Sequence, residues 1–522
     1  MKQQDFFRGA TILAFAGFVT KLLGAVYRIP LTNIIGAEAM GIYQLIFSVY
    51  ALFLTTSTGG LPAGLSKLIA ETRADGGGDA EVSRIAGSAL GLTGLTSLLF
   101  VAALVLFARA IASVQGNSGV YSGYAVIAPA IFFVGIISVM RGWFQGGINM
   151  TPTALSQIAE QVIKLGVGLA LAAVLIKKGA LYGAIGALAG VVAAELAAAA
   201  YLYVLFLKSG GRLEIAVGLK QLKQDFKKVA KYSIPITIGG MLMPLTQFAD
   251  SFLVINILNK AGFALNLSTS LYGILTGPVS SMINLPVVVT ISLAVVIIPV
   301  VSRQRLRRNV DEILSKSRFA IKTALFIGVP SAILFVAFSD EIMGLLYPNF
   351  QAYELAAAST LLKISSAGIV FLAAMQIITA LLQALDRRML PIRNLAVAMA
   401  VKIAFNIVLI RAMGITGAAL STVISYFCAA ALNFLSLGRL IGFNKRFLFA
   451  ALKTLTAGAA MAGFVLFTKN VVTNVYLRLF VVSALAAILY ILISLFIGLF
   501  SDEEIEGFPL GKYIMKFKRK QA

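Results

Sequence analysis

Two basic residues stand inside the first long apolar stretch of the chain. Lys21 and Arg28 lie in residues 8–35, which are otherwise apolar enough to cross a membrane. A charge at bilayer depth costs at least about 2.5–3.5 kcal/mol and needs a partner or a water-filled cavity. Seven residues make about two helical turns, so both cations share one helix face, about 10 Å apart. They suit a pyrophosphate, which Arg holds by forked hydrogen bonds and Lys as a point charge; alternatively, Arg28 reaches the membrane surface and Lys21 pairs with a carboxylate.

Charged and amide side chains also occur in the fourth to sixth apolar stretches. Glu160 and Lys164 are four residues apart with the acid first, which favours an ion pair on one helix, and we prefer this interpretation. Glu195, in an alanine-rich stretch, competes for Lys164. Arg141 and Gln145 lie near a cytoplasmic end, where they either mark topology or face the mouth of a cavity. With the two cations of the first stretch, Arg141, Lys164 and Gln145 form the candidate substrate-binding set.

An acid in the seventh stretch has no cation within one turn of its own helix. For this acid, Asp250, the best candidate partner is Lys402 in the eleventh stretch, four residues before Asn406. Alternatively, Asp250 binds a proton or a sodium ion with help from Asn406. A buried Asp–Lys pair is structural while it is closed and functional if it opens in a conformational cycle. These residues, with Glu160 and Glu195, form the candidate ion-coupling or internal ion-pair set.

The composition excludes most other chemistry. Of 522 residues, 59% are hydrophobic and 12% charged, which leaves too little polar surface for a soluble enzyme or a disordered chain. There is no His and one Cys, Cys428, so a His-based triad, an imidazole metal site and a thiolate cluster are excluded. Because no phosphate-loop or zinc-protease motif occurs, we expect no cofactor and no metal. The net charge of +23 is expected to set membrane topology and not to bind nucleic acid.

About fourteen apolar stretches are long enough to span a bilayer. They lie at 8–35, 40–66, 85–109, 120–146, 152–176, 180–207, 229–258, 270–302, 318–338, 355–384, 390–411, 414–438, 446–468 and 474–500. With the N-terminus inside, Lys and Arg are roughly four times as frequent on the inner side as on the outer side. We therefore expect an all-α, multi-pass membrane protein with both termini in the cytoplasm.

The two halves of the chain resemble each other. Pro62 and Pro299 occupy matching places, and GAIGAL at 183–188 matches GITGAA at 414–419. This repeat predicts two parallel six-helix lobes around a central cavity. The lobes are residues 1–207 and 229–441, joined by a cytoplasmic amphipathic linker, 208–228. Two extra helices, 442–500, and a cytoplasmic tail, 501–522, follow; the tail is expected to contact anionic lipid. Glycine pairs at GxxxG spacing, among them Gly186 and Gly190, are expected to pack helices.

The motifs KLLGAVYR (21–28) and IGAEAMGIYQL (35–45) carry a family resemblance. The chain resembles the sporulation stage V protein B branch of the polysaccharide flippases, in the multidrug/oligosaccharidyl-lipid/polysaccharide superfamily. The resemblance implies alternating-access translocation of an undecaprenyl-(pyro)phosphate-linked saccharide, such as lipid II or another wall polysaccharide, across the bacterial cytoplasmic membrane. It also implies membrane lipids and the cell-wall synthesis machinery as partners.

The resemblance extends to individual site residues, with departures. In an RxLGxxR motif of lipid II flippases, two cations bind the substrate pyrophosphate; Lys21 replaces the first Arg, and Arg28 follows one residue late. Further family arginines in spans two and eight have no match at 57–64 and 280–286. Some relatives bind sodium between spans seven and eleven. Asp250 and Asn406 match that site, whereas Lys402 occupies a sodium-ligand position, so we hypothesise that its ammonium replaces the ion. Coupling is then to protons or membrane potential, or is lost.

Three other functions remain open. A drug or organic-ion antiporter of the same superfamily is disfavoured for cationic drugs, because like charges repel in a cationic cavity. A membrane glycosyltransferase or polymerase usually has a large outer loop with catalytic acids, and the outer connections here are short. A non-transporting scaffold for wall synthesis is the third alternative.

Overall fold

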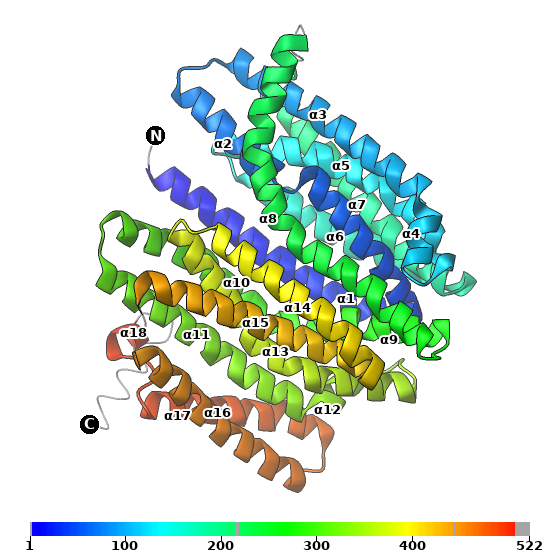
Figure 1. Ribbon diagram of the computed structural model, residues 1–522, viewed down its shortest axis with the longest axis vertical. Coiled ribbons are helices and arrows are strands. Elements are labelled where there is room, and N and C mark those ends of the chain that lie inside the picture. The colour runs from blue at the N-terminus through cyan, green and yellow to red at the C-terminus, as the bar shows by residue number, and fades with distance from the viewer. Residues whose placement is uncertain (1–2, 215–218, 443–444, 507–522) are drawn as a thin grey trace. The chain divides into compact units, whose positions relative to one another are not determined.

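The computed structural model describes residues 3–214, 219–442 and 445–506. Within these residues the secondary structure is helical and contains no strand, as Figure 1 shows. Thirteen helical stretches are long and apolar enough to cross a membrane. The first stretch, Thr11–Ala74, is 64 residues long and contains a break, so it counts as two spans. The expected fourteen-helix, all-α membrane fold is therefore confirmed for the described part of the chain.

The elements follow one another with short connections. They are α1 (Gln3–Thr58), α2 (Leu61–Ala74), α3 (Asp79–Leu106), α4 (Ala108–Val114), η1 (Ser118–Val120), α5 (Tyr121–Gly146), α6 (Thr151–Leu175), η2 (Ile176–Lys178), α7 (Ala180–Lys208), α8 (Leu219–Lys260), α9 (Leu265–Ile274), η3 (Leu275–Val279), α10 (Ser280–Leu306), α11 (Val310–Ala337), α12 (Ser339–Leu346), α13 (Ala352–Ala384), α14 (Met389–Met413), α15 (Ile415–Ile441), α16 (Lys445–Val471), η4 (Leu477–Val482), α17 (Ser483–Phe496) and α18 (Asp502–Glu506).

The break in α1 lies at Gly36. This residue has φ of 78° and ψ of 175°, whereas its neighbours in α1 are helical. A positive φ is a conformation that glycine adopts at little cost, because it has no Cβ. The break separates the predicted spans 8–35 and 40–66, and it places the end of the first span about two helical turns after Arg28.

Contacts between residues divide the chain into two compact units. Of the described residues, those within 1–281, 347–357 and 403–418 form the first unit, and those within 282–346, 358–402 and 419–522 form the second. This division does not test the predicted lobes, which stay a prediction. Part of the predicted linker, residues 215–218, and most of the predicted tail, residues 507–522, lie outside the described residues.

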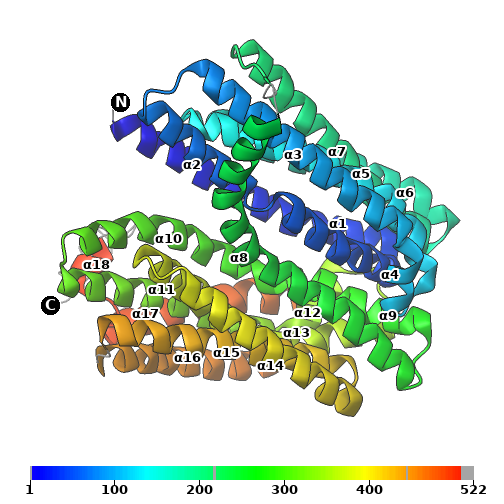
Figure 2. The same cartoon turned by 45° about the horizontal axis from the view of Figure 1, so that its top comes forward.

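In the first unit, α3, α5, α6 and α7 lie side by side, as both ribbon views show (Figures 1 and 2). A Cβ on Gly190 would lie 2.2 Å from the Cα of Gly168, so α6 and α7 touch backbone to backbone. A Cβ on Gly186 would likewise lie 2.6 Å from the carbonyl oxygen of Leu171. The predicted packing role of Gly186 and Gly190 is confirmed.

Helix α8 continues from the predicted linker into the seventh span. From Leu219 it runs without interruption to Lys260 and carries Pro235 and Pro244 inside it. A proline inside a helix removes a backbone donor and bends the axis. Figure 2 shows α8 changing direction along its course. The bent helix carries Asp250 toward its C-terminal end.

The second unit contains the two long helices near the end of the chain, α16 and α17. Helix α16 packs against α11 and α17. The core of this packing contains Phe338, Met461, Val465, Ala486 and Tyr490, all buried. These apolar contacts hold α16 and α17 against α11.

Candidate functional site

Three long apolar helices of the first unit bring charged residues together. Arg141 on α5 forms an ion pair with Glu160 on α6, with 3.0 Å between Nη2 and Oε2. Its Nε also donates to Ser156 Oγ at 3.1 Å. The two charged side chains are only 16% and 18% exposed. Glu195 on α7 is 8% exposed and lies beside Glu160, within electrostatic range of Arg141. We call Arg141, Glu160, Lys164 and Glu195 the charged cluster.

The expected pairing of Glu160 with Lys164 is wrong. Glu160 is bound by Arg141, from the neighbouring helix. The Lys164 ammonium instead lies over the rings of Tyr27, at 5.2 Å, and Phe47, at 5.6 Å, both on α1. A guanidinium offers a carboxylate two parallel donors, whereas the faces of two aromatic rings attract a compact ammonium. Arg141 therefore pairs with the carboxylate, and Lys164 contacts the aromatic rings. Helical spacing alone does not predict this arrangement.

Arg28 lies against an irregular turn of a later helix. Its Nη1 donates to the carbonyl oxygen of Thr276 at 3.4 Å, and Gln44 Nε2 donates to the same oxygen at 2.8 Å. Thr276 belongs to η3, a π-helical turn that contains Pro278. Wide π turns interrupt the regular helical hydrogen bonds and are frequent at functional sites. The sequence pattern does not predict Thr276 as the neighbour of Arg28; the Gly277–Pro278 pair within an apolar run is the signal that could have indicated this irregular turn.

The remaining predicted substrate residues lie on the same helices. Lys21 lies on α1 two turns before Arg28, and its side chain is exposed. Gln145, at the end of α5, donates to Thr153 Oγ1 at 3.4 Å, next to the ion pair of Arg141. The structure therefore brings Arg141, Gln145 and Lys164 to neighbouring turns of α5 and α6. The other two cations, Lys21 and Arg28, lie two turns apart on α1.

The predicted coupling acid has an amide partner. Asn406 Nδ2, on α14, donates to Asp250 Oδ1 at 2.8 Å. Asn406 is 1% exposed, and Lys402, one turn earlier on α14, is 7% exposed. The predicted neighbourhood of Asp250 and Asn406 is thus observed. In the described part of the chain, no group of three or more Cys, Asp and Glu side chains is arranged to hold a metal ion.

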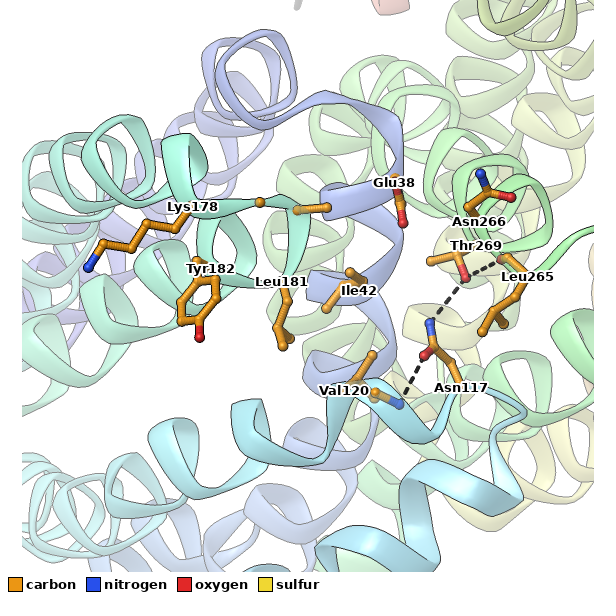
Figure 3. A pocket seen from close by; sticks show the side chains of 13 residues that line it. Glu38, Ile42, Asn117, Val120, Lys178, Leu181, Tyr182, Leu265, Asn266 and Thr269 are labelled. Carbon is orange, nitrogen blue, oxygen red and sulfur yellow. Dashed lines mark hydrogen bonds between the residues drawn. The ribbon is translucent and has the colours of Figure 1, made fainter.

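A pocket of about 540 Å³ opens in the first unit near the break of α1 (Figure 3). Asn117 and Thr269 lie on one side of it, where the Asn117 amide donates to Thr269 Oγ1 at 3.2 Å. Lys178 and Tyr182 lie on the other side, and Leu181 and Ile42 lie between. The connections that line this pocket all belong to the side that the charge distribution predicts to be outer. It contains none of the predicted substrate residues.

Long apolar helices, thirteen stretches in the described part of the chain, define this chain as a multi-pass membrane protein. Residues 6–305 match the family described as polysaccharide biosynthesis protein, and the chain belongs to this family. Stage V sporulation protein B of Bacillus subtilis (strain 168) is 30% identical over 429 residues, covering 81% of this chain and 82% of the relative. Lipid II flippase MurJ of the same organism is 26% identical and covers 84% of each chain.

Solved structures show the same fold. A lipid II flippase MurJ in an inward closed conformation superposes with a TM-score of 0.74, covering 94% of this chain and 99% of that one, at 16% identity. An inward-facing multidrug resistance MATE family transporter of the MOP superfamily gives 0.67 and covers 81% and 94%, also at 16% identity. The resemblance drawn from the motifs of α1 is confirmed, as is the expectation of a transporter and not an enzyme.

Proposed function

We propose that this protein is a flippase that moves a polyprenyl-diphosphate-linked saccharide across the bacterial cytoplasmic membrane. The observation that carries the proposal is the set of cations at membrane depth in the first unit, Arg28 above all. Its guanidinium meets only a backbone carbonyl at 3.4 Å among its hydrogen-bond partners in the described residues, so its charge is not cancelled there. Such a charge at membrane depth is available to an anion.

The saccharide substrates of the named relatives support this assignment. A relative is named for lipid II, and the family for polysaccharide biosynthesis. In our proposal, Arg28 and Lys21 bind the diphosphate, and Lys164, Arg141 and Gln145 contact the polar head group. The two six-helix lobes alternate access, both termini are cytoplasmic, and the lipid tail stays in the bilayer.

Reconstitution tests the proposal directly. In proteoliposomes, we expect the purified protein to move fluorescent lipid II, or a simpler polyprenyl-diphosphate sugar, at least about tenfold faster than protein-free vesicles. Comparing the two substrates identifies the preferred saccharide. A fluorescent phosphatidylcholine is the control and should not move faster. Equal transport of phosphatidylcholine would identify a nonspecific scramblase, and export of an organic-cation dye without saccharide transport would favour the antiporter; both results contradict the proposal.

Asp250 couples transport to an ion or potential gradient in this scheme. In Asp250→Asn, the new amide oxygen can still accept the hydrogen bond from Asn406 while the negative charge is lost. We expect flipping driven by an imposed proton gradient or membrane potential to fall about tenfold, to the undriven rate. Asp340→Asn is the matched control, because Asp340 is a 57% exposed acid paired with Lys363 at 2.8 Å. Driven flipping equal to wild type in Asp250→Asn would remove the coupling role.

A further inference from the structure

A second cluster of basic residues lies in the second unit, away from the residues considered above. Arg318 and Lys322 on α11 and Lys453 on α16 line a pocket of about 290 Å³. Phe449 and Ala450 of α16 and the segment after α17, from Gly498 to Glu504, form the rest of its wall. Neither the charged cluster nor the coupling acid uses these residues.

Lys322 is fixed in the wall of the pocket. Its side chain is 6% exposed, and its Nζ lies 2.5 Å from Glu504 Oε2. The same ammonium lies 4.7 Å from the centre of the Phe500 ring. Phe500, Leu499 and Ile505 form a small apolar core that packs against Phe319 and Phe326 of α11. The segment that closes the pocket is therefore held by packing as well as by charge.

Glu504 offsets only one of the three cations. Burial by itself would raise the pKa of this carboxyl, but hydrogen bonds from Lys322 and from the Ser501 backbone N–H hold it below its usual range. Glu504 is therefore ionised at neutral pH. Lys453 donates to the carbonyl oxygen of Gly498 at 2.8 Å, which leaves its charge in place. With Arg318, the lining carries three cations and one carboxylate, and an excess of positive charge remains.

The pocket lies where polar helix ends meet lipid-facing surface. The first two turns of α11 carry Asp311, Glu312 and Lys316, and the apolar part of the helix begins after Arg318. On α16, Phe449, which lines the pocket, and Leu452 are 58% and 51% exposed. A membrane helix with such exposed apolar side chains faces acyl chains. The basic pocket thus opens beside an apolar surface suited to a lipid tail, where α11 changes from polar to apolar residues.

We propose that this pocket binds the phosphate of an anionic phospholipid, with an acyl chain lying along Phe449 and Leu452 of α16. Lys453 and Arg318 contact the phosphate, and the Lys322–Glu504 pair forms the base of the site. A free phosphate ion shares the charge but not the tail, so the exposed apolar rim favours the lipid.

Binding to the full-length protein in detergent tests this site. Phosphatidylglycerol, phosphatidylcholine and inorganic phosphate are titrated separately, with bound lipid counted by native mass spectrometry. We expect phosphatidylglycerol to bind at least about tenfold more tightly to the wild type than to the double variant Arg318→Gln, Lys453→Gln. The affinity of the wild type for phosphatidylcholine should be as low as the affinity of the double variant for phosphatidylglycerol.

Lys316→Gln is the matched control, because Lys316 lies on α11 near Arg318 but pairs with Glu312 at 3.7 Å. It should bind phosphatidylglycerol as the wild type does. The single variants Arg318→Gln and Lys453→Gln keep the test valid if the double variant unfolds, and melting temperatures identify that case. Unchanged phosphatidylglycerol binding in folded variants, or displacement of the lipid by millimolar phosphate, would overturn the proposal.

Discussion

Replacing Arg28 by alanine is expected to reduce flipping of a polyprenyl-diphosphate saccharide on the order of 10- to 100-fold, since a hydrogen bond to a charged group contributes about 1.5–3 kcal/mol. Its guanidinium has a weakly held carbonyl contact at 3.4 Å and can turn to an anionic substrate. Arg28→Lys keeps the charge but loses the forked donors, so we expect an intermediate rate. Lys21→Ala should have a smaller effect, because an exposed ammonium is better hydrated. The measurement is initial flipping rate in proteoliposomes at equal protein incorporation.

Two control variants separate substrate binding from structure in this experiment. Gln44 donates to the same Thr276 carbonyl as Arg28, at 2.8 Å, so Gln44→Leu perturbs the η3 contact without removing a charge. Arg109 is an exposed cation over the Tyr121 ring on α5, and Arg109→Ala removes a charge at the surface. Both should flip at nearly the wild-type rate. Wild-type flipping by the double variant Lys21→Ala, Arg28→Ala would refute diphosphate binding by α1.

The spans could be predicted from the sequence because the bilayer imposes a length and an apolar composition on each helix. The predicted span 152–176 corresponds to Thr151–Lys178, and 390–411 corresponds to Met389–Met413. The end of the second span was missed: it was expected at 66, whereas α2 continues to Ala74. Hydropathy falls once a helix leaves the lipid, but its backbone hydrogen bonds continue into the polar turns.

The sequence shows which charged residues inside the spans need a partner, because an unpaired charge is costly in lipid. It does not show which partner each of them has. The four-residue spacing predicted an ion pair between Glu160 and Lys164, because sequence spacing identifies only neighbours on the same helix. The observed partner, Arg141, is on α5, and the choice depends on how α5 packs against α6. The Thr276 carbonyl is a backbone group that every residue type has, so the sequence does not indicate that it contacts Arg28. Asp250 and Asn406, 156 residues apart, could be linked because an acid inside a span needs a polar partner from another span, and the family resemblance points to the same two positions.

The ion pair of Arg141 should contribute strongly to the stability of the first unit, because both side chains are mostly buried. Arg141→Met leaves Glu160 and Glu195 with Lys164 as the one cation of the charged cluster. Removing one partner of a buried pair costs about 3–5 kcal/mol, because the other charge stays buried and unpaired. We expect a loss of this size in the free energy of unfolding, measured by denaturant titration in detergent. Lys67→Gln, at an exposed pair with Glu71, should cost less than about 1 kcal/mol.

The double variant Arg141→Met, Glu160→Leu distinguishes a structural role of this pair from a role in substrate binding. It leaves Glu195 and Lys164, one acid and one base, so the charged cluster is balanced again. Apolar replacement of a whole buried pair is often neutral or stabilising, and we therefore expect the unfolding free energy to return to near the wild-type value. If Arg141 contacts the substrate, as we propose, this folded variant flips at least about tenfold more slowly than the wild type. Recovery of both stability and flipping would show that the pair only supports the fold, and Arg141 would then leave the substrate-binding set.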